Sequence, residues 1–337
     1  MKEPVVAVRA LTKVYRVHER EEGLRASLRS ILRRRFRDVP AVTEATFEIA
    51  AGEIVGFLGP NGAGKTTTLK MLSGLLFPTS GEARVVGRVP WRRESGFLRS
   101  IALLMGNRTQ LVWDIPAADS FRVLQEIYRI PEASYRATLK ELSDLLELEP
   151  LLHKPVRNLS LGERMKVEFA AGLLHGPQVA FLDEPTLGLD VSMQSRIRHF
   201  VAEYNKRTGA TILLTSHYMD DVVALCKRVI VIHRGRLLYD GELGELAQRM
   251  APYKVITVAL RNGAGSAALD DLGTVVKREE ASATVHVPRE AVAERTARIV
   301  QVLGPSLADI SVEDPPIEEV IDRVFAGENI AGVAGAR

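Results

Sequence analysis

A glycine-rich segment, GPNGAGKT at residues 59–66, follows a short apolar run and precedes a helical pattern. It fits the pattern G-x-x-x-x-G-K-[ST], whose glycines let backbone N–H groups curl around phosphate oxygens without obstruction by Cβ atoms. The positive end of the helix dipole adds to the attraction for an anion. We expect Lys65 to contact the β- and γ-phosphates of a nucleotide and Thr66 to ligate Mg²⁺. The alternative is a glycine-rich turn that happens to precede a helix, and the strand–loop–helix context argues against it.

The residues expected to bind the nucleotide phosphates are Gly59, Pro60, Asn61, Gly62, Ala63, Gly64, Lys65, Thr66 and Thr67.

Two adjacent carboxylates, Asp183 and Glu184, end the apolar run 179–182. Carboxylates at the end of a buried strand are costly unless a cation lies beside them. Because Mg²⁺ meets that requirement, we expect Asp183 to hold the metal and Glu184 to orient or deprotonate the attacking water. The alternative is a solvated turn after an edge strand, and the phosphate loop upstream argues against it.

Two further polar residues adjoin predicted elements. Ser160 precedes the helix predicted over 163–175, and with Glu163 it has the spacing of a capping box. Because a helix N-terminus with a serine hydroxyl is also a phosphate site, we interpret Ser160 both as a cap and as a contact to the phosphate of a second copy. His217 follows the apolar run 211–215, so it is expected at the sheet edge where ligands bind. A structural histidine is the alternative there.

Short apolar runs alternate with helical patterns along most of the chain. The strands are expected at 4–9, 42–49, 54–58, 179–182, 211–215, 229–233 and 236–239. The helices are expected at 65–75, 117–148, 163–175, 191–207 and 218–226. This alternation predicts an α/β fold with helices on both faces of a sheet.

The net charge of +3 is unevenly distributed. Residues 16–37 hold eight arginines and three glutamates, so this segment carries +5 and the rest of the chain −2. Apolar residues recur in it at helical spacing, which predicts a basic amphipathic helix inserted at 16–38. Contact with anionic lipid headgroups or with an acidic loop of a membrane partner is one interpretation, and a solvated charged insertion is the other.

The C-terminal part has a different pattern. Residues 252–325 are expected to form a small α+β domain, and the Gly/Ala-rich segment 326–337 a flexible tail. The single cysteine, Cys226, excludes an internal disulfide framework. No run reaches the roughly 18 apolar residues of a spanning helix, and the start does not resemble a signal peptide. We therefore expect a soluble cytoplasmic protein, which can still associate with a membrane through a partner.

Taken together, these residues resemble the ATP-binding subunit of an ABC transporter over about residues 4–249. The matching motifs occur in this order: the phosphate loop 59–66, LSLGE at 159–163, Asp183-Glu184, GLD at 188–190 and His217. The phrase WDIP at 113–116 and the C-terminal segment look most similar to drug-resistance exporters of the ABC-2 type. The resemblance implies a P-loop NTPase core of ABC type with antiparallel β and helical subdomains.

The resemblance also implies roles for single positions. Tyr15 would stack on adenine, although it is equally interpreted as a core residue of the first sheet. Ser160 and Gly162 would contact the γ-phosphate of ATP bound to the opposite subunit, and Asp190 would couple the two sites. His217 would hold the γ-phosphate and the attacking water. Two ATP molecules, with Mg²⁺, would lie within a head-to-tail dimer.

Two departures from the family pattern concern the site. The usual signature LSGGQ has Leu161 and Glu163 here in place of a glycine and the glutamine. By offset from Leu111 and Ile115, the glutamine of the family pattern falls on Asn107, whose amide is one methylene shorter but remains a candidate ligand for nucleotide and metal. Gln110 is the alternative for that amide. We favour Asn107 because this register keeps the downstream pattern aligned.

The resemblance implies an ATPase that powers export of an unidentified substrate through separate ABC-2-type permease subunits. Such a protein would lie peripherally on the cytoplasmic face of the cell membrane. One alternative is a soluble ABC ATPase acting on nucleic acid or ribosomes, although those usually carry tandem ATPase units or long coiled-coil arms. The other is a regulatory nucleotide-binding module in which Asn107 weakens hydrolysis.

Deletion of residues 17–37 tests the membrane interpretation of the basic segment. We expect the assembled transporter to lose part of its association with membranes that contain anionic lipid, because each basic residue near such a surface contributes about 1 kcal/mol. Flotation with vesicles measures this association. Unchanged flotation of the deletion variant would favour the solvated insertion.

Overall fold

The computed structural model describes residues 4–18, 36–106, 109–261, 269, 271 and 273–326. The chain divides into two compact units, Met1–Asp240 and Gly241–Arg337. The sequence placed the boundary between 249 and 252. The helix α9 (Leu243–Met250) thus belongs to the second unit.

A six-stranded sheet forms the centre of the first unit, in the order β5-β6-β7-β3-β8-β9. Its strands are β3 (Ile54–Leu58), β5 (Ile101–Met105), β6 (Val179–Asp183), β7 (Thr211–Thr215), β8 (Arg228–His233) and β9 (Arg236–Glu242). The first five in that order run parallel. Strands β6 and β7 are buried along their whole length, as the apolar runs of a parallel sheet covered on both faces should be. The expected α/β fold is confirmed.

A three-stranded antiparallel sheet, in the order β2-β1-β4, adjoins it. It contains β1 (Val6–His18), β2 (Phe36–Ile49) and β4 (Ser80–Val85). The helix predicted over 16–37 is wrong at both ends, because Val17 pairs with Arg37 in the β-ladder. The middle of that segment, 19–35, lies outside the described residues. At the two described ends of the segment, backbone pairing between the strands therefore decides the conformation.

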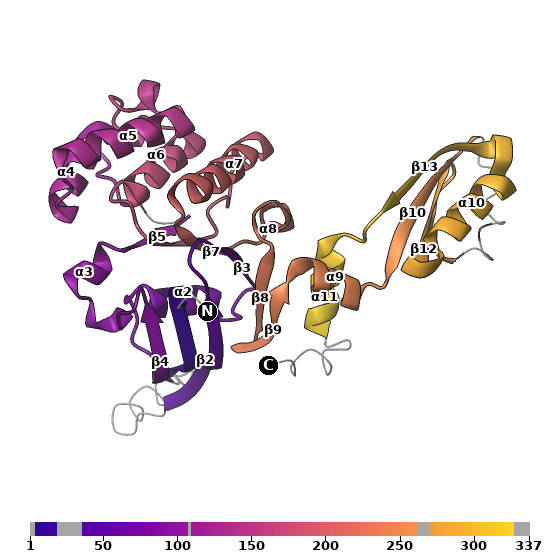
Figure 1. The fold of residues 1–337 in the computed structure, drawn as a ribbon, viewed down its shortest axis with the longest axis horizontal. Coiled ribbons are helices and arrows are strands. Elements are labelled where there is room, and N and C mark those ends of the chain that lie inside the picture. The colour runs from indigo at the N-terminus through magenta and orange to yellow at the C-terminus, as the bar shows by residue number, and fades with distance from the viewer. Residues whose placement is uncertain are drawn as a thin grey trace, which may run out of the picture. The chain divides into compact units, whose positions relative to one another are not determined.

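One hydrophobic core joins the two sheets around the helix α2 (Lys65–Leu72). Leu69, Met71 and Leu72 of this helix are buried among Phe57 and Phe181 of the central sheet and residues of β1 and β2. The core therefore fixes the start of α2, which immediately follows the glycine-rich loop. Figure 1 shows α2 beside the antiparallel sheet.

A helical layer covers the β5 side of the central sheet (Figure 1). It comprises α4 (Ala117–Tyr128), α5 (Glu132–Leu146) and α6 (Leu161–Leu173). The single helix predicted over 117–148 is wrong, because Arg129 ends α4 in a left-handed conformation and Pro131 precedes α5. A proline inside a helix would remove a backbone hydrogen bond, so the chain restarts there.

Outside this layer, the described part of the first unit also has the helices α3 (Ser95–Leu98), α7 (Val191–Thr208) and α8 (Met219–Leu225). Short 3₁₀ turns are η1 (Pro90–Arg92), η2 (Glu149–Leu151) and η3 (Val156–Asn158). The sequence predicted α7 and α8 but neither β4 nor β5. The strand β4 was missed because it begins with Ser80, Gly81 and Glu82, which are exposed and typical of a turn. Only Ala83 and Val85 of this strand are buried.

The second unit is a four-stranded antiparallel sheet with helices, in the order β11-β12-β10-β13. Its elements are β10 (Tyr253–Leu260), β11 (Thr274–Arg278), β12 (Ser282–Pro288), β13 (Leu307–Glu313), α10 (Val292–Leu303) and α11 (Ile317–Ala326), with η6 (Arg289–Ala291) and η7 (Gly304–Ser306) as short turns. Ile299 and Leu303 of α10 pack on the buried residues of β10 and β12. The unit therefore has a hydrophobic core of its own. Within the described residues, no helix has the length and hydropathy needed to span a bilayer.

Candidate nucleotide site

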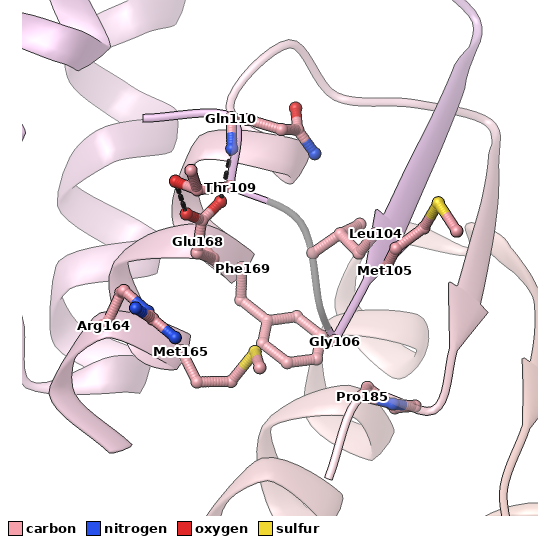
Figure 2. A pocket seen from close by; sticks show the side chains of 10 residues that line it. All are labelled: Leu104, Met105, Gly106, Thr109, Gln110, Arg164, Met165, Glu168, Phe169 and Pro185. Atoms are coloured by element: carbon pink, nitrogen blue, oxygen red, sulfur yellow. Dashed lines mark hydrogen bonds between the residues drawn. The ribbon is translucent and has the colours of Figure 1, made fainter. Parts of the chain in front are cut away.

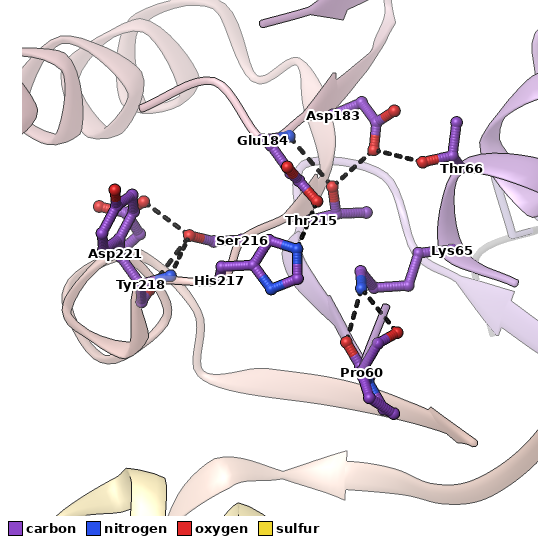
Figure 3. Close-up of polar contacts among 11 residues, drawn as sticks. Pro60, Lys65, Thr66, Asp183, Glu184, Thr215, Ser216, His217, Tyr218 and Asp221 are labelled. Atoms are coloured by element: carbon purple, nitrogen blue, oxygen red, sulfur yellow. Dashed lines mark hydrogen bonds and ion pairs between the residues drawn. The ribbon is translucent and has the colours of Figure 1, made fainter. Parts of the chain in front are cut away.

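The glycine-rich loop joins β3 to α2, as the sequence predicted. Gly64 precedes α2 with a φ of 111°, and a Cβ there would lie 2.5 Å from the carbonyl oxygen of Ala41. Lys65 is 5% exposed, and its Nζ donates to the carbonyl oxygens of Gly59 at 2.5 Å and Pro60 at 3.1 Å. These bonds hold the ammonium inside the curve of the loop (Figure 3).

Two effects on the pKa of Lys65 act in opposite directions. Burial lowers the pKa of its ammonium group, while the nearby carboxylates of Glu184 and Asp183 act in the opposite direction. The carboxylates lie at the end of β6, whereas the loop that carries Lys65 follows β3. The fold therefore brings together the loop and an acidic pair that is far from it in the sequence. The juxtaposition expected from the sequence is therefore present in the structure.

Asp183, 7% exposed, lies at the end of β6 between two hydroxyl groups. Its Oδ1 accepts a hydrogen bond from Thr66 Oγ1 at 3.1 Å and another from Thr215 Oγ1 at 2.8 Å. Figure 3 shows both bonds converging on this oxygen. The sequence analysis missed Thr215, which closes the polar set from the neighbouring strand β7.

Glu184 and His217 contact each other beside this carboxylate. The Nε2 of His217 lies 2.7 Å from Oε1 of Glu184, and both side chains are partly exposed. Glu184 has a φ of 53°, a left-handed conformation that is uncommon for a residue other than glycine. Its backbone N–H donates to the carbonyl and hydroxyl oxygens of Thr215, each at 3.1 Å. The turn is thus held in place by β7.

A second buried carboxylate, Asp221 of α8, supports the loops that carry Glu184 and His217. Asp221 is fully buried and accepts from the hydroxyl groups of Thr186 at 2.5 Å and Ser216 at 2.8 Å. Its other oxygen pairs with Arg198 of α7 at 3.0 Å. Thr186 lies two residues after Glu184 in the sequence, and Ser216 directly precedes His217. Asp221 therefore fixes both loops, a role that no local sequence pattern indicated.

A cavity of about 170 Å³ opens beside the acidic pair. Its lining residues are Thr66, Lys70, Met105, Gly106, Asp183, Glu184 and Leu187. Asn107 lies outside the described residues. The side-chain amide of Gln110 donates to the carbonyl oxygen of Leu103 at 3.1 Å and lines other cavities, so the structure does not bring it to Asp183.

The other predicted site residues lie at the starts of helices and on the antiparallel sheet. Ser160 caps α6 in a complete capping box with Glu163. Asp190 caps α7, its Oδ1 accepting from the N–H of Met193 at 3.0 Å. Neither they nor Gly162 is among the described residues that line the cavity at Asp183. Tyr15 lies on β1, is 38% exposed, and has the ammonium of Lys13 5.3 Å from its ring centre.

Comparisons with known proteins identify this arrangement. Residues 42–187 match the family described as "ABC transporter", and residues 252–313 match "EvrA-like ABC transporter, C-terminal domain". The chain is 32% identical to the daunorubicin resistance ATP-binding protein DrrA3 of Streptomyces coeruleorubidus, over 85% of this chain and 92% of that protein. The chain belongs to the ABC transporter ATP-binding family. It is also 36% identical to the ABC transporter ATP-binding protein NatA of Bacillus subtilis, over 63% of this chain and 88% of that protein.

Solved ABC structures share the fold. The structure entitled "Structure of ATP binding subunit of ABC transporter" superposes with a TM-score of 0.60 at 23% identity, over 73% of this chain and 92% of that one. An ATP-binding cassette in a dimeric post-hydrolysis state bound to ADP and Pi superposes with a TM-score of 0.57, also at 23% identity, over 70% of this chain and 98% of that one. The resemblance inferred from the motifs is confirmed, and this ABC protein is an ATPase with a P-loop fold.

The Arg198–Asp221 pair gives a testable stability prediction. Arg198→Met should lower the free energy of unfolding by about 3–5 kcal/mol, because it leaves the buried Asp221 carboxylate without its cation. Arg196→Met is the matched control on the same helix. That guanidinium is 57% exposed and pairs with Glu147, so its loss should cost at most about 1 kcal/mol. Urea unfolding measures both, and equal losses would contradict the role given to Arg198.

Proposed function

We propose that this ATPase powers export of a substrate across a membrane through separate membrane-spanning subunits of the ABC-2 type. The observation that carries the catalytic part is the convergence of Lys65, Asp183, Glu184 and His217 at one edge of the central sheet. The transport part is supported by relatives whose names state it. These include the Nod factor export ATP-binding protein I of Ralstonia nicotianae, 33% identical over 64% of this chain and 66% of that protein. The protein would then lie on the cytoplasmic face of the membrane, bound to its partners.

The residues at Asp183 fit a magnesium ion that accompanies ATP. Mg²⁺ prefers oxygen ligands and is usually held by one or two carboxylates together with substrate phosphates. Asp183 Oδ1 and Thr66 Oγ1 lie 3.1 Å apart and supply a carboxylate and a hydroxyl oxygen. Within the described residues no group of three or more acidic, His or Cys side chains is placed to hold a metal, so the phosphates would complete the set. When bound, the ion neutralises charge that develops on the phosphate oxygens.

In the proposed mechanism each residue acts on phosphate or water. The phosphate loop and the Lys65 ammonium position the β- and γ-phosphates, and positioning of this kind supplies most of the catalysis in phosphoryl transfer. Glu184 accepts the proton of the attacking water. His217, at 2.7 Å from that carboxylate, holds the γ-phosphate and orients the same water. Asn107 is proposed as the amide that reaches the metal and the water.

Ser160 and Gly162 are proposed to serve the ATP of a second copy of the chain. Both lie at the start of α6, and neither is among the described residues lining the cavity at Asp183, which supports a role at a nucleotide other than the one held by their own loop. A head-to-tail dimer would place the N-terminus of α6, with its positive dipole end, against the partner's γ-phosphate. Asp190 would then lie between the two sites. Tyr15 is proposed to stack on adenine.

Glu184→Gln tests the assignment of the base. The amide keeps the size of the side chain but cannot accept the water proton, so turnover should fall by about 10²-fold or more while ATP binding and dimer formation persist. Steady-state phosphate release, nucleotide binding and light scattering measure the three properties. Near-normal turnover would refute the role of Glu184.

The transport proposal requires a different measurement. The protein is co-expressed with the membrane proteins encoded beside its gene, purified with them and reconstituted into vesicles. Co-purification together with cargo-stimulated ATP hydrolysis is the expected result. Purified ATPase that hydrolyses ATP alone, and instead binds ribosomes or nucleic acid, would support the soluble alternative.

A further inference from the structure

A separate cavity of the first unit lies between the helices α5, α6 and α7. It measures about 240 Å³ and shares no lining residue with the cavity beside Asp183. Its polar lining residues are Glu147, directly after α5, Lys166 of α6, and Ser195, Arg196 and His199 of α7. The cavity is therefore distinct from the nucleotide site and has polar groups from all three helices.

The lining of this cavity includes a buried cation. Lys166 is 8% exposed, and its Nζ donates to Oε2 of Glu147 at 3.1 Å. An ammonium group has three N–H donors, and within the described residues Glu147 is the acceptor that this one meets. A charge removed from water is costly unless it is paired and hydrogen-bonded. Lys166 therefore has donors left for an acceptor that enters the cavity.

Glu168, two residues further along α6, is a buried ionisable group with a different environment. It is 7% exposed, and its Oε2 accepts a hydrogen bond from the backbone N–H of Gln110 at 2.9 Å. Its Oε1 accepts from the hydroxyl of Thr109, and Figure 2 shows both bonds. Protein groups thus reach both oxygens of Glu168. Of these two buried residues, Lys166 is the one with unfilled hydrogen-bonding positions.

Positive groups outnumber negative ones around the cavity. The guanidinium of Arg196 contacts the same oxygen of Glu147 at 2.9 Å, so one carboxylate serves two cations. The hydrogen bond from Lys166 is the largest cause that holds the pKa of Glu147 below its ordinary value. The side chains of Ser195 and His199 are exposed and contact no polar group of the described residues. The lining is therefore positive on balance, with free donors on its α7 side.

We propose that this cavity binds a small phosphate-type oxyanion. The donors on α6 and α7 are an ammonium, a guanidinium, a hydroxyl and an imidazole. A phosphate group offers at least three acceptor oxygens to such a set, whereas a carboxylate offers two. Arginine pairs with phosphate through two parallel hydrogen bonds, and lysine binds it as a point charge. Free phosphate and the phosphate group of a small ester share this chemistry.

Titration of the full chain with inorganic phosphate tests the site. The nucleotide site is first saturated with ADP and Mg²⁺, and the imidazole C–H signals of His199 and His217 are followed by NMR. The variants His199→Gln and His217→Gln assign the two signals. Phosphate in the cavity should shift the His199 signal saturably, whereas phosphate beside the nucleotide shifts that of His217. Sodium chloride at equal ionic strength should leave His199 unshifted, because it screens charges without filling the site.

Arg196→Met should weaken phosphate binding about tenfold or more, because hydrogen bonds between charged groups are the strong ones. Its guanidinium is 57% exposed, so the variant should fold. Arg207→Met is the matched control on the same helix. That side chain pairs with Glu203 at 3.6 Å and does not line the cavity, so phosphate affinity should be unchanged.

Glu147→Gln distinguishes an anion site from a simple cluster of ion pairs. The amide keeps an oxygen for Lys166 but carries no charge, so phosphate should bind about threefold tighter or more. Inorganic phosphate and glycerol 3-phosphate are compared to identify the source, and the one that binds more tightly is the better model of the ligand. The proposal is overturned if His199 shows no saturable shift in the parent protein and in Glu147→Gln, if Arg196→Met binds phosphate as the parent does, or if acetate binds as tightly as phosphate.

Discussion

A single buried oxygen, Oδ1 of Asp183, holds the site together. A carboxylate in that position is costly unless its lone pairs are filled, and here two hydroxyl groups fill them. Thr66 comes from the start of α2 and Thr215 from the end of β7. The bonds therefore tie the phosphate loop to two neighbouring strands. Because Thr215 also receives the N–H of Glu184, the same contact fixes the turn that carries the proposed base.

The two buried carboxylates, Asp183 and Asp221, have different surroundings and therefore different roles. Asp183 faces hydroxyl groups and an open cavity, so its remaining lone pairs are available to a cation. Asp221 is enclosed and neutralised by Arg198, so it acts only through the hydroxyl groups that it holds. Two aspartates thus differ in their surroundings: Asp183 is open to a cavity, and Asp221 is enclosed and orients loops. Rigid loops are required because phosphoryl transfer depends on positioning more than on covalent participation of the protein.

The sequence predicted those parts of the site whose residues are neighbours in the chain or stand at strand ends. Lys65 and Thr66 lie in one loop, and Asp183, Glu184 and His217 follow strands of one parallel sheet, whose carboxyl ends meet at one edge. Thr215 and Asp221 were missed because threonine at a strand end and aspartate in a helix are ordinary there. Thr215 bonds to Asp183 and Asp221 bonds to Thr186 and Arg198, partners that lie tens of residues away in the chain. The helix predicted over 16–37 is wrong at its two ends, because pairing between β1 and β2 sets an extended backbone conformation there.

Gly106 ends the chain that leaves β5 and lies against the turn that carries Glu184. A Cβ at this position would lie 2.6 Å from the carbonyl oxygen of Glu184, so glycine is the residue that permits the close approach. The N–H of Gly106 also donates to the carbonyl oxygen of Asp183 at 3.1 Å. Backbone contacts alone therefore hold the end of β5 against the acidic pair, and a side chain at position 106 would push the two apart.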